Sequence, residues 1–160
     1  MIAVRPGMPG DIDDAIAVWA EANVGSEPPG HAARLRAWAA DPGALLIVAI
    51  EGTTIAGMVL LLAGRADDGA GPLIADLGHL TGLAVLPDRQ GQGVGGRLLV
   101  AAETAAASAS RRRMTAWVRT TNQASLRLFA RNGFGPVGRE LQDSSGMRMS
   151  LLQKWICAIS

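Results

Sequence analysis

The most informative segment of this chain is Leu83-Ala84-Val85-Leu86-Pro87-Asp88-Arg89-Gln90-Gly91-Gln92-Gly93-Val94-Gly95-Gly96-Arg97-Leu98-Leu99. It begins with apolar residues typical of a strand, passes through glycines and continues into a helical pattern. The first-turn amides of a helix have no partner within the helix, and the helix dipole places partial positive charge there. Because glycines carry no side chain, a phosphate can approach these amides closely. The segment therefore predicts an anion-binding turn between a strand and a helix.

The glycines at 91–96 also satisfy the pattern G-x-G-x-x-G of dinucleotide-binding folds. In those folds the turn lies in the first β-α-β unit, and an acidic residue follows about 20 positions later. Here the segment begins only at residue 83, and the next expected strand ends in Trp117-Val118-Arg119 without a carboxylate. Arg119 could bind a 2′-phosphate, but too little chain remains for the other strands of that fold. A dinucleotide site is the less favoured interpretation.

Composition predicts one globular domain spanning residues 1–160. Of the 160 residues, 49% are hydrophobic and 18% are charged, which argues against disorder. The net charge of +1 provides no field to attract nucleic acid or a membrane. Cys157 is the only cysteine and His31 and His79 are the only histidines, so we expect no disulfide and no metal site. The chain shows no signal-peptide pattern, and we expect a cytoplasmic protein.

Apolar spacing, glycines and prolines predict a mixed α/β domain in the order β-α-α-β-β-β-α-β-α-β-β. A purely parallel sheet is excluded because helices and strands do not strictly alternate. On the first two helices, Trp19 and Trp38 are expected to pack in the core, and His31 to lie exposed. The expected strands are 2–5, 44–50, 53–62, 77–86, 114–118, 134–137 and 147–152, and the expected helices begin near 11 and cover 31–39, 94–109 and 122–131.

Two motifs resemble those of the GNAT superfamily of acetyl-coenzyme A-dependent N-acyltransferases. Gln90-x-x-Gly93-x-Gly95 resembles the family motif Q/R-x-x-G-x-G/A. Asn122-x-Ala124-x-x-x-Leu128-Phe129-x-x-x-Gly133-Phe134 is similar to its signature N-x-x-A-x-x-x-Y-x-x-x-G-F. The resemblance implies a mostly antiparallel central sheet flanked by helices, with two central strands that splay apart.

The resemblance also implies a site for acetyl-coenzyme A. The strand backbone at Leu83 and Val85 would bind the pantetheine arm, and the Leu83 N–H would polarise the thioester carbonyl. Asn122 would contact the far side of the pantetheine or a bound water. The coenzyme A pyrophosphate would be held by the turn, which comprises Gln90, Gly91, Gln92, Gly93, Val94, Gly95, Gly96 and Arg97. Arg89, just before the turn, is a further candidate for contact with the adenosine phosphate.

The sequence departs from the family at Phe129, which stands where the signature has a tyrosine. That tyrosine is a usual general acid for the departing thiolate, and phenylalanine has no proton to give. Because a thiol with a pKa near 8.5 leaves fairly well, solvent can protonate it instead. The alternative is a non-catalytic module that only binds acyl-coenzyme A.

A catalytic base is expected at His79, four residues before Leu83 on the same strand and, by regular alternation, on the same face. The alternative is a structural histidine bonded inside the sheet. Asp76 and Glu21 are the reserve candidates for the base.

These observations predict an enzyme that transfers an acetyl group to a primary amine by direct attack. The acceptor, a small molecule or a peptide, cannot be read from the residues. A homodimer follows from the resemblance alone.

Overall fold

The computed structural model describes residues 1–25, 30–143 and 145–156, so Cys157 lies outside the described residues. Contacts within the chain group it into two compact units. Unit 1 comprises Met1–Leu62 and Thr81–Ala102, and unit 2 comprises Ala63–Leu80 and Glu103–Ser160.

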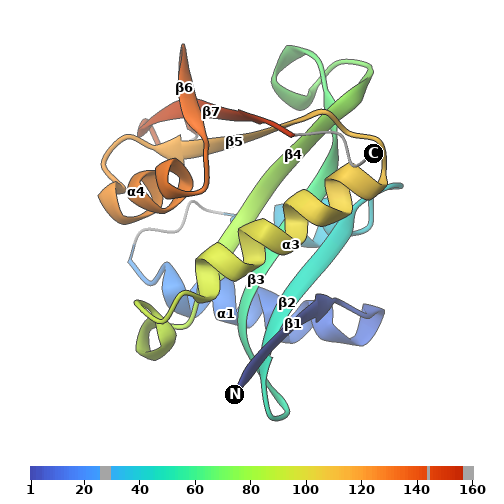
Figure 1. Ribbon diagram of the computed structural model, residues 1–160. Coiled ribbons are helices and arrows are strands. Elements are labelled where there is room, and N and C mark those ends of the chain that lie inside the picture. The colour runs from blue at the N-terminus through green and yellow to red at the C-terminus, as the bar shows by residue number, and fades with distance from the viewer. Residues whose placement is uncertain (26–29, 144, 157–160) are drawn as a thin grey trace. The chain divides into compact units, whose positions relative to one another are not determined.

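The strands form a mixed sheet in the order β1-β2-β3-β4-β5-β7-β6 (Figure 1). The recorded strand pairs are antiparallel except β4 with β5, which pair in parallel from Leu77–Leu80 to Arg113–Ala116. The predicted element order and the mostly antiparallel α/β sheet are therefore confirmed. The strands are β1 (Ile2–Pro6), β2 (Leu45–Glu51), β3 (Thr54–Arg65), β4 (Leu73–Val85), β5 (Arg113–Arg119), β6 (Gly135–Gln142) and β7 (Arg148–Trp155), and the α-helices are α1 (Ile12–Ala22), α2 (His31–Ala39), α3 (Val94–Ser108) and α4 (Gln123–Arg131).

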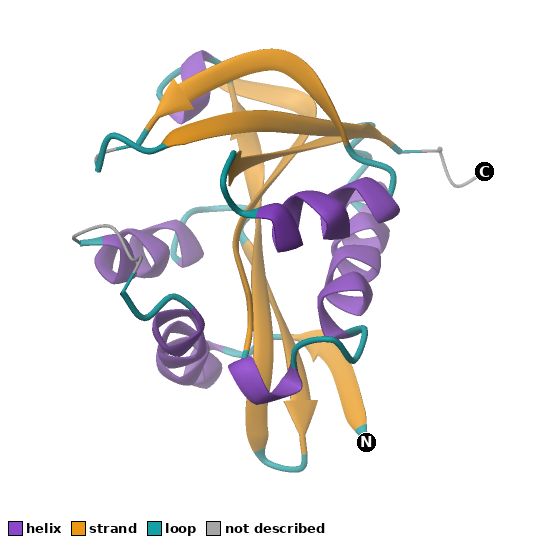
Figure 2. Ribbon diagram, turned by 90° about the vertical axis from the view of Figure 1, so that its left-hand side faces the viewer, coloured by secondary structure: helices purple, strands orange, loops and turns teal. Residues whose placement is uncertain are grey.

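Unit 1 places helices on both faces of its strands (Figure 2). On one face, α1 and α2 bury Trp19 and Leu35 against β2 and β3, where Val48, Met58 and Leu60 are also buried. Helix α1 forms this contact because its apolar residues recur every three to four positions. On the other face, the first half of α3 packs closely against β3. A Cβ atom on Gly57 would lie 3.1 Å from Leu98 Cδ1 and 3.3 Å from Val94 Cγ1.

Unit 2 contains β5, β6 and β7 with α4, which run from orange to red in Figure 1. Phe129 on α4 is buried, and its ring meets Phe134 edge to face, with centroids 5.0 Å apart. Glu103 at the second half of α3 accepts a 2.7 Å hydrogen bond from Lys154 Nζ on β7. The aromatic pair joins α4 to the segment that leads into β6, and the ion pair joins α3 to β7.

Three predictions about local structure need correction. Strand β4 begins at Leu73 and not at residue 77. Asp76 separates Leu73, Ile74 and Ala75 from the apolar run that starts at Leu77, and residues 73–76 alternate between exposed and half-buried positions. Strands β6 and β7 extend beyond their predicted ends. Strand β6 continues to Gln142, which pairs with Arg148, and β7 continues to Trp155, which pairs with Arg113 on β5. His31 is half-buried, because its ring stacks on Trp19 at 4.5 Å and meets Trp38 at 5.8 Å.

Candidate active site

The glycine turn follows directly from the end of β4 in unit 1. Leu86 N donates to Ala56 O at 2.8 Å, which keeps the strand end beside β3. A short 3-10 turn, Pro87–Arg89, then reverses the chain, and proline suits its first position. Gln90 Nε2 donates to Val85 O at 3.0 Å and closes the turn onto the strand. The side chain of Gln90 thus shapes the turn.

The glycines adopt the backbone that the predicted anion site requires. Gly91 and Gly93 have φ values of +79° and +81°, a region that favours glycine. A Cβ atom at either position would meet no heavy atom within 4 Å, so the turn is open. Helix α3 begins at Val94, and Arg97 N donates to Gly93 O at 3.1 Å. The first-turn amides of Val94, Gly95 and Gly96 therefore precede the first bond of the helix, beside an exposed surface.

Two arginines flank the turn, and both are engaged with other protein groups. Arg89 makes two hydrogen bonds to Glu51, from Nε at 2.9 Å and from Nη2 at 2.8 Å. These bonds lower the pKa of the Glu51 carboxyl. Arg97 is exposed, and its Nη1 donates to Ile2 O at 2.6 Å.

Gly82 interrupts β4 immediately before Leu83. Its φ of +68° is left-handed, and a Cβ atom there would lie 2.8 Å from Leu35 Cδ2 and 3.3 Å from Met58 Cε. Both the conformation and the close packing require glycine. Since the strand is irregular here, regular alternation does not extend from His79 to Leu83, and their placement on one face stays a prediction. Leu83 and Val85 are both half-buried.

His79 lies in unit 2, where β4 pairs with β5. Its Nδ1 is 2.8 Å from Oγ1 of Thr115, the buried residue directly opposite on β5. Burial lowers the pKa of His79 from 6.5 to about 4, because the apolar surroundings disfavour the imidazolium. The imidazole is therefore neutral at physiological pH and is held by one defined partner.

Asn122 and Phe129 in the second motif both have structural roles. Asn122 is the N-cap of α4, and its Oδ1 accepts a 3.1 Å hydrogen bond from Ser125 N. Phe129 points into the apolar packing with Phe134 and is 4% exposed. The side chain that replaces the family tyrosine is thus a packing residue without a proton to donate.

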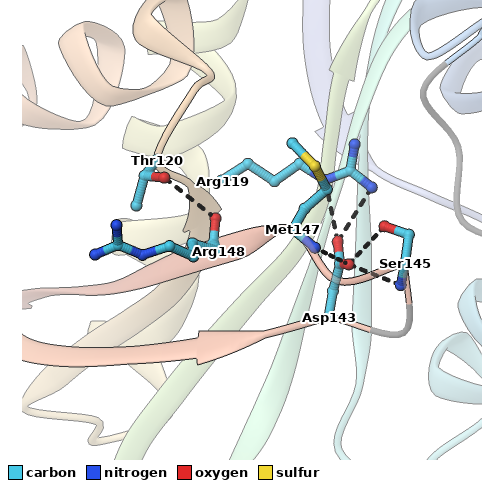
Figure 3. Close-up of polar contacts among 6 residues, drawn as sticks. All are labelled: Arg119, Thr120, Asp143, Ser145, Met147 and Arg148. Atoms are coloured by element: carbon cyan, nitrogen blue, oxygen red, sulfur yellow. Dashed lines mark hydrogen bonds and ion pairs between the residues drawn. The ribbon is translucent and has the colours of Figure 1, made fainter.

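The turn between β6 and β7 is organised by the carboxylate of Asp143 (Figure 3). It accepts hydrogen bonds from Ser145 N at 2.9 Å, Ser145 Oγ at 2.6 Å and Met147 N at 3.0 Å. Arg119, considered above for a 2′-phosphate, forms a 3.2 Å ion pair with it. Burial alone would raise the pKa of Asp143, but these hydrogen bonds and the Arg119 charge lower it.

The reserve candidates for the base occupy ordinary positions. Asp76 lies 3.7 Å from Arg113 Nε, and Glu21 is exposed on α1. Among the described residues, no three histidine, cysteine, aspartate or glutamate side chains group as a metal site would require. None of the helices in the described part of the chain has the length and apolarity of a membrane span.

Unit 1 brings together the predicted site residues from Leu83 to Arg97, while His79 and Asn122 lie in unit 2. Sequence reasoning did not predict three residues that shape the site or contact its candidates: Gly82, Glu51 and Thr115. An isolated glycine within a strand pattern is the available signal for Gly82. Glu51 and Thr115 are distant in sequence from Arg89 and His79, and no local pattern indicates these pairs.

Comparison with known proteins supports the resemblance. No curated protein matches the chain. An acetyltransferase of the GNAT family from Streptococcus pneumoniae superposes with a TM-score of 0.74 at 20% identity, covering 98% of this chain and 100% of that one. The ribosomal-protein-S18-alanine N-acetyltransferase from Escherichia coli superposes with a TM-score of 0.79 at 17% identity, covering 100% and 96%.

A Salmonella typhimurium structure with its cofactor acetyl-CoA superposes with a TM-score of 0.76 at 18% identity, covering 100% of this chain and 96% of that one. At these identities the likeness shows the fold alone. The model of the acetyltransferase (GNAT) family matches residues 12–134, well over half of the sequence. The chain therefore belongs to the GNAT family of acetyltransferases.

Proposed function

We propose that this protein, as a single domain of residues 1–160, transfers an acetyl group from acetyl-coenzyme A to a primary amine. The observation that carries the proposal is the turn before α3, where Gly91 and Gly93 leave an open, side-chain-free approach to a helix N-terminus. An anion such as the coenzyme A pyrophosphate suits that position.

The turn residues Gln90 to Arg97 bind the pyrophosphate in this proposal, mainly through backbone amides. The β4 backbone at Leu83 and Val85 binds the pantetheine arm. The left-handed Gly82 supports this role, because it breaks the regular backbone immediately before the Leu83 amide. The Leu83 N–H then polarises the thioester carbonyl and stabilises the oxyanion. In this proposal Asn122 contacts the pantetheine through its Nδ2 group, because its Oδ1 atom caps helix α4.

In the reaction, the amine nitrogen attacks the thioester carbon, a C–N bond forms and the C–S bond breaks. One proton leaves the nitrogen, and coenzyme A departs as the thiolate. His79 takes this proton at Nε2, provided that Nδ1 carries the hydrogen shared with Thr115. The nitrogen becomes more acidic as the C–N bond forms, so a neutral imidazole with a pKa of about 4 is still able to accept the proton. Solvent protonates the thiolate because Phe129 cannot.

The acceptor is a small molecule or a peptide with a primary amine. If the His79 imidazole is only structural, Asp76 or Glu21 is the catalytic base in its place. Nucleic acid and membranes are not partners in this proposal. A cytoplasmic location and a homodimer complete it. The second candidate, a module that only binds acyl-coenzyme A, is favoured by one observation, the buried Phe129.

Two measurements test the proposal. In the first, acetyl-coenzyme A at a hundredfold excess over its dissociation constant should add about 2.7 kcal/mol of stability. This raises the melting temperature by roughly 5–11 °C for a chain of this size, whereas NADH and NADPH should have little effect. A shift with a nicotinamide cofactor and none with coenzyme A would overturn the donor site.

In the second measurement, the protein is incubated with acetyl-coenzyme A and a panel of amines: amino acids, peptides, polyamines and aminoglycosides. We expect thiol release that requires one class of amine, together with an acetylated product detected by mass spectrometry. Stabilisation by acetyl-coenzyme A without thiol release from any amine would indicate the binding module.

A further inference from the structure

The two arginines that flank the glycine turn are both anchored at one place in unit 1. Arg89 lies just before the turn and Arg97 lies in the first turns of α3. Arg89 binds Glu51 on β2, and Arg97 binds the carbonyl of Ile2 on β1. Ile2 and Glu51 are direct partners in the antiparallel β1–β2 ladder. Both ends of the turn are thus tied to a single cross-strand pair.

The contact between Arg89 and Glu51 is specific in geometry. Nε and Nη2 each donate to a different carboxylate oxygen, at 2.9 Å and 2.8 Å. The remaining terminal nitrogen, Nη1, lies 3.1 Å from Asp88 Oδ2. A paired, parallel contact of this kind fixes direction as well as distance. A lysine has one point charge and cannot reproduce it.

The segment between these two anchors is the part of the site whose backbone most needs to be held in one conformation. Four of the six residues from 91 to 96 are glycines, and glycine loses more conformational freedom on ordering than any other residue. A ligand that had to order this segment would bind more weakly than one that meets it already ordered.

We propose that Glu51 is a positioning residue for the coenzyme site. Through Arg89, and together with the Ile2 carbonyl that holds Arg97, it fixes the glycine turn in its binding conformation before the ligand arrives. This inference rests on the proposed function. It differs from the sequence expectation for Arg89, because the guanidinium acts here on the protein and is not kept for the adenosine phosphate.

The test compares Glu51→Gln, Arg89→Gln and the double variant with the wild type, using coenzyme A and dephospho-coenzyme A as ligands in calorimetry. Each single variant should weaken both ligands equally, by about three- to tenfold. The double variant should be no weaker than either single one, because both changes remove the same contact. Arg89→Lys should fail to restore affinity. Asp13→Asn, which removes the 2.5 Å ion pair to Arg36 in the same unit, is the control and should bind like the wild type.

A merely structural role would lower the melting temperature without this pattern, so two further readouts are needed. With an acceptor amine, the Glu51 variant should raise KM for acetyl-coenzyme A and leave kcat nearly unchanged. Without any ligand, hydrogen exchange of the Arg97 amide, which donates to Gly93 O at the start of α3, should be faster than in the wild type and in Asp13→Asn.

Several outcomes would overturn the inference. One is wild-type affinity in Glu51→Gln with unchanged exchange of the Arg97 amide. Another is loss of coenzyme A binding in Arg89→Gln with dephospho-coenzyme A unaffected, which would assign Arg89 to the 3′-phosphate. If the wild type itself binds no coenzyme A, the proposed function fails, while the exchange measurement still decides whether Glu51 holds the turn.

Discussion

Replacing His79 with asparagine should make the protein less sensitive to acid. In the folded state burial lowers the pKa of His79 from 6.5 to about 4, whereas in the unfolded chain the imidazole has its ordinary pKa. At a pH between these two pKa values, His79 is protonated in the unfolded chain and neutral in the folded protein. Acid therefore favours unfolding, and the penalty is absent above pH 7.

The size of this effect follows from the two pKa values. Linkage gives a loss of about 2 kcal/mol at pH 5 and about 3 kcal/mol at pH 4, relative to neutral pH. For a chain of this length, 2 kcal/mol corresponds to about 4–8 °C in melting temperature. Asparagine is the suitable replacement because its amide places a polar atom near the position of Nδ1, where it can still bond Thr115 Oγ1.

The assay is thermal unfolding of the wild type and His79→Asn at pH 7.5 and pH 5.0. We expect the melting temperature of the wild type to fall by about 4–8 °C more than that of the variant. Between pH 7.5 and pH 9 the two proteins should respond in parallel, which serves as the internal control. An equal fall in both proteins on acidification would refute a partly buried, neutral imidazole.

Three further predictions test the turn, the strand irregularity and the β6–β7 connection. Gly95→Asp should leave the melting temperature unchanged, since a carboxylate suits the first turn of a helix. It should weaken coenzyme A binding at least tenfold, because repulsion of the pyrophosphate costs about 1.4 kcal/mol or more. Unchanged affinity in calorimetry would place the anion elsewhere. Gly82→Ala should destabilise the protein by about 2–4 kcal/mol through left-handed strain and overlap with Leu35, and a wild-type urea midpoint would contradict the geometry. Asp143→Asn should lower stability by about 1–3 kcal/mol at pH 7. Because the pKa of Asp143 is lowered, this difference should shrink as the pH falls below the ordinary carboxyl value of about 3.9, and a difference that stays constant between pH 7 and pH 3 would show that the charge is not responsible.

Much of the fold was predictable because its signals are local. The glycines at 91–96 and the apolar runs at β2 and β3 determine backbone conformation over a few residues, and the structure places a turn and a hairpin there. The start of β4 was missed because Asp76 interrupts the apolar pattern between Ala75 and Leu77, although the strand continues through it.

The candidate site was predictable where backbone groups are expected to bind the ligand. It was not predictable where side chains from distant parts of the sequence contact each other. The turn from Gln90 to Arg97 can be read directly from its glycines. The contact of Arg89 with Glu51 joins residues far apart in the chain, and neither has a local pattern that reveals the other. The pKa of His79 depends on what surrounds the folded strand, which no spacing of residues encodes.

The edge-to-face pair of Phe129 and Phe134 has a consequence for the choice of acyl donor. A tyrosine hydroxyl would neutralise the departing sulfur and make the rate nearly independent of which thiol leaves. Because Phe129 has no such hydroxyl, the proposed reaction depends on the intrinsic acidity of the thiol. At one fixed concentration of amine, acetyl thioesters of more acidic thiols should then react faster, and the rate should rise steadily with the acidity of the thiol. The protein would thus select its donor by leaving-group acidity as well as by shape.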